Sequence, residues 1–126
     1  MGDDGMKPEL KRSHAPIFWG LFGAGGMLAA LFGPMLVFIT GIAAPLGWLP
    51  DGAADYDTLR ALAQSLIGKA VCFGLIALLL WHAAHRIYHS LHDVGIRGGA
   101  LAKACTYGVA ALGTLAAAGL LLAMGF

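Results

Sequence analysis

Charged side chains are scarce in this sequence: Asp, Glu, Lys and Arg make up 12% of its 126 residues. That share is about half of what a soluble domain usually carries. Hydrophobic residues make up 59%, and so little polar surface could not cover an apolar core of that size in water. The composition therefore predicts one domain whose main solvent is the lipid bilayer. The net charge of +1 argues against nucleic acid as a partner.

Cysteine is also rare, and both residues, Cys72 and Cys105, lie inside apolar stretches. A disulfide framework or a zinc site needs more cysteines at closer spacing. We therefore interpret the two as small buried hydrophobic side chains. The first residues, MGDDGMKPELKRSH, hold no short apolar stretch that ends in a cleavage site, so no cleaved signal peptide is expected.

Long uncharged stretches separate the few charged residues. No Asp, Glu, Lys or Arg occurs at positions 13–50 or 104–126, and only Lys69 occurs at 61–85. A helix needs about 20 apolar residues to cross roughly 30 Å of hydrocarbon, so three spans fit, at about 17–41, 61–85 and 104–125. Helical patterning extends the second helix to about 58–93 and the third to about 100–125. The prediction is an all-α, integral membrane, three-helix transmembrane bundle over residues 16–126, preceded by an N-terminal tail over residues 1–15.

Basic residues predict the orientation of the bundle. The N-terminal tail and the second loop carry three each, whereas the first loop carries one. Because loops rich in Lys and Arg stay on the cytoplasmic side, the N-terminus and the second loop are expected in the cytoplasm, and the C-terminus in the periplasm. The basic residues counted are Lys7, Lys11, Arg12, Arg60, Arg86, Arg97 and Lys103.

Four histidines share one face of the second helix. At about 100° per residue, His82, His85, His89 and His92 fall within an arc of about 80°. Four interpretations compete: a polar helix end that touches headgroups or a partner subunit, a metal site completed by Asp93, a haem with His82 as one axial ligand, and a quinone site.

A quinone site needs an apolar slot with hydrogen-bond donors at the membrane edge. Trp19 begins the first span, and His85 and Arg86 end the second, so an antiparallel pair places them at the same depth on the same side. Indole, imidazole and guanidinium groups all donate hydrogen bonds. Aromatic-belt and snorkelling roles are the alternative for these residues.

Polar residues also mark the opposite end of the second span. Gln64 and Ser65 lie about 32 Å from Arg86 along a helix, and Lys69 follows one turn deeper. These side chains are expected either to form hydrogen bonds between helices or to line a second, distal quinone pocket.

The sequence resembles the D subunit of the bacterial quinol:fumarate reductases, the smaller of two membrane anchors in the four-subunit type of that enzyme. The resemblance covers nearly everything from Lys11 onward. It rests on four stretches: KRSHAPIFWGLFGAGGM at 11–27, GIAAPLGWLP at 41–50, LAQSLIGK at 62–69 and WHAAHRIYHSLHD at 81–93.

The resemblance implies a complex in the bacterial inner (cytoplasmic) membrane that serves anaerobic respiration. A flavoprotein subunit with FAD reduces fumarate to succinate, an iron–sulfur subunit carries the electrons, and two anchors oxidise menaquinol. This chain would have no activity alone, no catalytic or metal-binding residue and no haem. Alternative interpretations are a haem b-containing succinate dehydrogenase anchor and a purely structural anchor.

The resemblance also assigns roles to particular residues. Trp19, His85 and Arg86 match the quinol site nearest the iron–sulfur subunit, called proximal here, and Gln64 and Ser65 match positions near the distal side. The sister anchor and the iron–sulfur subunit are expected to supply the rest of the proximal site.

Overall fold

The computed structural model describes residues 14–126, and within them every regular element is helical. Three stretches are long and apolar enough to cross a membrane: Ala15–Ala43, Leu66–Asp93 and Gly99–Ala123. The predicted all-α fold with three spans is therefore confirmed. Residues 1–13 of the predicted N-terminal tail lie outside the described part of the chain. In chain order the elements are α1 (Ala15–Phe38), a π-helical turn η1 (Ile39–Ala43), α2 (Tyr56–Gln64), α3 (Leu66–Asp93) and α4 (Gly99–Ala123).

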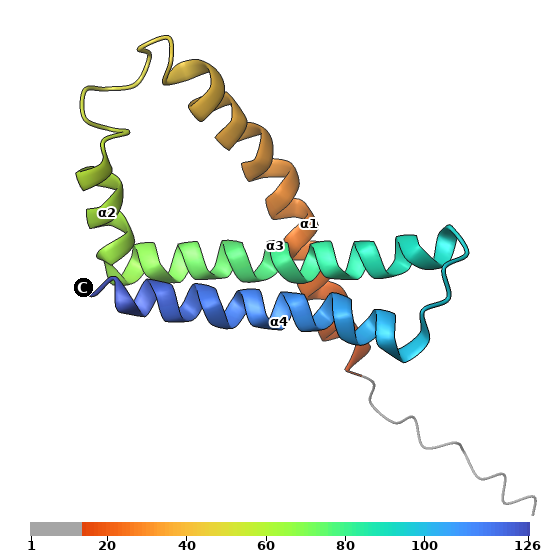
Figure 1. Cartoon of the computed structure of the whole chain (residues 1–126). Coiled ribbons are helices and arrows are strands. Elements are labelled where there is room, and N and C mark those ends of the chain that lie inside the picture. The colour runs from red at the N-terminus through yellow and green to blue at the C-terminus, as the bar shows by residue number, and fades with distance from the viewer. Residues whose placement is uncertain (1–13) are drawn as a thin grey trace, which may run out of the picture.

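Helix α3 is the central element, since it packs against α1, α2 and α4. Figure 1 shows α3 and α4 running antiparallel side by side, with α1 crossing α3. The start of α1, the end of α3 and the start of α4 lie towards one end of the bundle, whereas α2 and the end of α4 lie at the other. This arrangement brings residues near position 20 close to residues near positions 85 and 105.

Small residues form the contact between α3 and α4. Ala84 and Ala110 are among the few buried apolar side chains. Gly113 of α4 faces α3 so closely that an added Cβ would lie 2.9 Å from Cδ1 of Leu80. Helices in lipid associate through such small residues, because close backbone approach replaces the hydrophobic effect as the source of packing energy.

Helix α1 continues through Pro34 and then widens into the π-helical turn, in which the Ala44 N–H donates to the Ile39 carbonyl at 2.9 Å. Beyond its crossing with α3, α1 points away from the other helices (Figure 1). A Cβ added at Gly33 or Gly41 would meet nothing within 4 Å. The far half of α1 thus has no other helix of residues 14–126 beside it.

The helix expected over 58–93 is divided at Ser65, so the prediction of one continuous helix is wrong. Ser65 has an extended backbone (φ −67°, ψ 149°), and its Oγ accepts a hydrogen bond from the Gly68 N–H at 3.0 Å. The same hydroxyl donates to the Leu62 carbonyl at 2.7 Å. Ser65 therefore caps α3 instead of continuing α2, as serine does readily. Helix α3 alone spans 28 residues, or about 42 Å, and not the roughly 55 Å of an unbroken helix.

Candidate functional site

The crossing of α1 over α3 is fixed by His82. Its Nδ1 lies 2.9 Å from the Phe22 carbonyl oxygen, which only accepts hydrogen bonds, so Nδ1–H is the donor. Gly25 is buried against the same residue, and an added Cβ there would lie 2.8 Å from the His82 Cβ and 2.7 Å from the Leu78 carbonyl oxygen. His82 thus links α1 to α3 by a hydrogen bond, which gives one of the four histidines a structural role.

His85 lies one turn further along α3, where all three long helices meet. Its ring stacks on Phe22 of α1 with a centroid separation of 3.9 Å and an interplanar angle of 20°. Its Nδ1 is 3.0 Å from the hydroxyl of Tyr107 on α4. On α3 itself, the His89 ring meets it edge-on at 4.3 Å. The imidazole is therefore held from both neighbouring helices.

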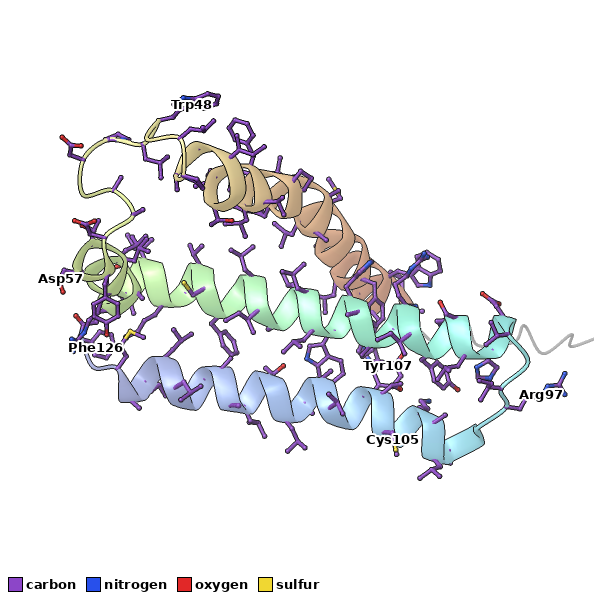
Figure 2. The ribbon with its side chains drawn as sticks, turned by 45° about the horizontal axis from the view of Figure 1, so that its top comes forward. Trp48, Asp57, Arg97, Cys105, Tyr107 and Phe126 are labelled. Atoms are coloured by element: carbon purple, nitrogen blue, oxygen red, sulfur yellow. The ribbon has the colours of Figure 1, made fainter. Side chains whose placement is uncertain are left out.

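An aromatic-walled cavity of about 360 Å³ opens beside His85. Figure 2 shows Tyr107 on the stretch of α4 that runs beside α3. The cavity combines flat apolar walls with an imidazole, a phenol and an ammonium group, which is the chemistry that a quinone headgroup requires. Its lining residues are Phe18 and Phe22 of α1, Trp81 and His85 of α3, and Lys103 and Tyr107 of α4.

Trp19 and Arg86, the other two predicted proximal residues, do not line this cavity. Trp19 follows Phe18 on α1 and is 77% exposed, and Arg86 follows His85 on α3 and is also exposed. Within residues 14–126, no hydrogen bond, ion pair or ring contact links either side chain to His85. His85 thus contacts α1 through Phe22 and not through Trp19. Trp19 and Arg86 lie on the outer surface, at the same end of the bundle as His85.

The predicted distal residues bond within the chain. The Gln64 amide donates to the Met124 carbonyl at 3.0 Å, and Ser65 caps α3 as described. Lys69 is only 6% exposed, and its ammonium donates to the carbonyls of Leu121, at 2.8 Å, and Ala63, at 3.3 Å.

Gln64, the last residue of α2, and Lys69, in the first turn of α3, both hold the end of α4. The Lys69 ammonium also lies 4.9 Å from the centroid of the Phe126 ring, which Figure 2 places beside the start of α3. We call Gln64, Lys69 and the carbonyls that they bind the helix-end clamp. These contacts give the polar side chains structural partners, as expected for hydrogen bonds between helices.

The two remaining histidines of α3, His89 and His92, both contact the Tyr88 ring. His92 Nδ1 lies 3.2 Å from the Tyr88 carbonyl oxygen one turn earlier, and His89 is exposed. In the part of the chain that the structure describes, no three His, Cys, Asp or Glu side chains come together in a group that could hold a metal ion.

Comparison with known proteins identifies the family. The protein family described as the D subunit of fumarate reductase matches residues 9–122, which is most of the chain.

The chain belongs to the family of fumarate reductase D subunits.

Three relatives from other bacteria are similar to this chain. The fumarate reductase D subunit of Vibrio parahaemolyticus is 43% identical over 113 residues, which cover 85% of this chain and 90% of the relative. The Vibrio cholerae protein of the same name is 41% identical over 102 residues, covering 81% and 78%. The Shewanella sp. protein is 42% identical over 107 residues, covering 85% and 88%. The chain is thus similar over nearly its whole length to subunits of a fumarate reductase complex, and its three spanning helices fit a membrane anchor.

Of the six residues that line the cavity in this fumarate reductase anchor, the sequence predicted only His85 as a site residue. Among the five that it missed, Tyr107 and Lys103 lie near the start of α4, where Lys103 was counted only as a basic loop residue and Tyr107 only as part of a span. One signal was available, since Tyr107 is the only aromatic residue between positions 99 and 125. A lone tyrosine at the end of a span where basic residues gather is a candidate for a polar contact with a neighbouring helix.

Proposed function

We propose that this chain is the membrane anchor subunit of a bacterial quinol:fumarate reductase in the inner membrane. It attaches the flavoprotein and iron–sulfur subunits to the membrane and forms one wall of the menaquinol-oxidation site. The observation that carries this proposal is the position of His85 beside an aromatic-walled cavity, in a chain of the fumarate reductase D-subunit family.

The proposed site lies at the cytoplasmic end of the bundle. The distribution of Lys and Arg supports placing the start of α1 and the end of α3 on that side. A cytoplasmic iron–sulfur subunit would then meet the chain beside His85. The C-terminus would lie in the periplasm.

Each residue has a part in the proposed site. The rings of Phe18 and Phe22 offer apolar surface to a naphthoquinol ring, and His85 offers a polar atom to one of its oxygens. Trp19 and Arg86, exposed beside them, are free to complete the site against a second anchor subunit. Bound menaquinol supplies the electrons and protons, and FAD and the iron–sulfur clusters belong to the partner subunits.

Replacing Arg86 tests the proposal. In the purified four-subunit complex, Arg86→Leu should lower menaquinol oxidation about tenfold or more, because a hydrogen bond to a charged group contributes about 1.5–3 kcal/mol. Fumarate reduction by a viologen dye, which delivers electrons without this chain, should stay unchanged. Arg97→Leu, an exposed residue in the connection between α3 and α4, is the matched control and should leave both activities unchanged.

Two outcomes would count against a quinol site here. If Arg86→Leu lowered the quinol and dye activities equally, the residue would serve assembly and the chain would be a purely structural anchor. If the variant oxidised menaquinol like the natural complex, Arg86 would have no part in the site.

A further inference from the structure

The cavity beside His85 offers one group that can accept a proton, the His85 imidazole, and that group is paired with Tyr107. Phe18 and Phe22 have no polar atom, and the Trp81 indole N–H already donates to Thr114 Oγ1 at 3.1 Å. The Lys103 ammonium has no lone pair. Among the residues that line the cavity, this leaves the paired side chains of Tyr107 and His85.

In that pair, one nitrogen of the imidazole is occupied and the other is not. His85 Nδ1 is 3.0 Å from the Tyr107 hydroxyl, and no described residue forms a hydrogen bond with Nε2. The stacked Phe22 ring, at 3.9 Å, restricts rotation of the imidazole about its own axis. Nε2 is thus the nitrogen that can meet a ligand.

We propose that Tyr107 is a positioning residue that holds His85 as the proton acceptor for quinol oxidation, an inference that rests on the function proposed above. A tyrosine hydroxyl can either accept a hydrogen bond or donate one. When it accepts from Nδ1–H, Nε2 bears the lone pair and can take a proton from a quinol hydroxyl. When it donates to Nδ1, Nε2–H can donate to a quinone carbonyl. Tyr107 therefore supports the tautomer that each form of the ligand needs.

The proton and electron balance of this step is complete. Oxidation of one quinol breaks two O–H bonds and releases two electrons and two protons. The electrons pass one at a time to an iron–sulfur cluster of the partner subunit, which is the oxidant. One proton goes to His85 Nε2, and the second goes to a carboxylate of another subunit. His89, whose exposed ring meets His85 at 4.3 Å, is the next basic group towards water, so His85 can be returned to its neutral form.

The test removes the Tyr107 hydroxyl in the assembled complex. Tyr107→Phe keeps the ring that packs 6.0 Å from Trp81 and deletes only the oxygen. Quinol oxidation should fall at least about tenfold in kcat, because a correctly placed general base typically contributes about 10²–10⁴-fold. The solvent deuterium isotope effect on quinol oxidation should rise, since proton transfer becomes slower than electron transfer. Dye-driven fumarate reduction should not change.

The matched control is Tyr88→Phe. Tyr88 lies on α3 with its ring 5.7 Å from that of Tyr107, and within residues 14–126 its hydroxyl forms no hydrogen bond. Losing this hydroxyl should leave the rate and the isotope effect as they are. If only Tyr107→Phe lowers the rate, the effect comes from the hydroxyl that contacts His85 and not from the loss of any tyrosine hydroxyl nearby.

Three results would overturn the inference: an unchanged rate in Tyr107→Phe, a lower rate with an unchanged isotope effect, or an equal loss of dye-driven activity. A lower rate with an unchanged isotope effect would assign Tyr107 to ligand packing. An equal loss of dye-driven activity would assign it to assembly. The proposed function is judged separately, because Arg86→Leu would still lower quinol oxidation if only the role of Tyr107 were wrong. If neither variant changed quinol oxidation, the proximal site itself would be wrong.

Discussion

At the scale of single residues, the contact between α1 and α3 depends on a missing side chain. Gly25 is the buried residue of α1, and His82 occupies the space where its side chain would be. The glycines at 20, 23 and 26 lie three residues apart, a pattern of small residues that is typical of close helix packing in lipid. Of these three, Gly26 meets His82, whereas Gly20 and Gly23 face open space. The sequence could predict that α1 packs closely but not through which glycines, because α1 is apolar around its whole circumference.

This contact predicts the effect of one added methyl group. Gly25→Ala should push α1 from α3 and lower the stability of the bundle by about 1–3 kcal/mol, the usual cost of overpacking. The measurement is the midpoint of thermal unfolding of the purified complex in detergent. Gly20→Ala adds the same methyl group where it meets nothing within 4 Å, and it should leave the midpoint unchanged. Equal midpoints for the two variants would show that the crossing is not tightly packed.

At the scale of elements, the break at Ser65 separates a short helix from a spanning one. Serine suits both a helix interior facing a neighbour and an N-cap, so the hydropathy pattern alone predicted one long helix. The deciding feature is tertiary: the Leu62 carbonyl lies over Gly68, where any Cβ would collide with it. The number of spans and their approximate boundaries follow from composition. The break at Ser65 depends on tertiary contacts, which composition alone does not predict.

The break predicts how Ser65 variants behave. Ser65→Ala should lower the free energy of unfolding by about 1 kcal/mol, since α3 loses its N-cap, while quinol oxidation at saturating substrate should not change. Ser65→Thr keeps a hydroxyl at the cap and should be close to the natural protein in stability. Thermal unfolding and quinol turnover, measured on the same samples, check both statements. A loss of quinol turnover at full stability in Ser65→Ala would instead support the distal quinone role.

At the scale of the whole molecule, the chain buries very little of its apolar surface in itself. Large hydrophobic side chains such as Met27, Leu31, Leu112 and Leu120 are exposed on its spanning helices. In water such a surface would cause aggregation, so lipid and partner subunits must cover it. The number of spans was predictable from the sequence because hydrocarbon thickness sets it. The His85–Tyr107 pair was not, because it depends on how α3 and α4 are rotated about their axes.

The orientation of the bundle is a prediction at the same scale. Reporter enzymes attached to the chain check it: alkaline phosphatase fused after Phe126 should be active, because it folds only in the periplasm. The same enzyme inserted at Arg97, between α3 and α4, should be inactive, and a green fluorescent protein inserted there should fluoresce. The reason is the surplus of Lys and Arg around that connection. The opposite pattern of activities would invert the bundle and place His85 on the periplasmic side.

The helix-end clamp also has a consequence for how the protein is made. Lys69 and Leu121, whose carbonyl accepts its shorter hydrogen bond, are 52 positions apart in the chain. The ribosome delivers α3 to the membrane before it has translated the last turn of α4, so the Lys69 ammonium reaches the membrane before the Leu121 carbonyl has been made. A lone lysine at the centre of a membrane helix costs about 3 kcal/mol, and the cost for Lys69 is smaller because it lies in the first turn of α3 and also donates to the Ala63 carbonyl. We therefore expect the second span to reach its final packing only after Leu121 has been translated, and a product truncated before Leu121 to lack this hydrogen bond between α3 and α4.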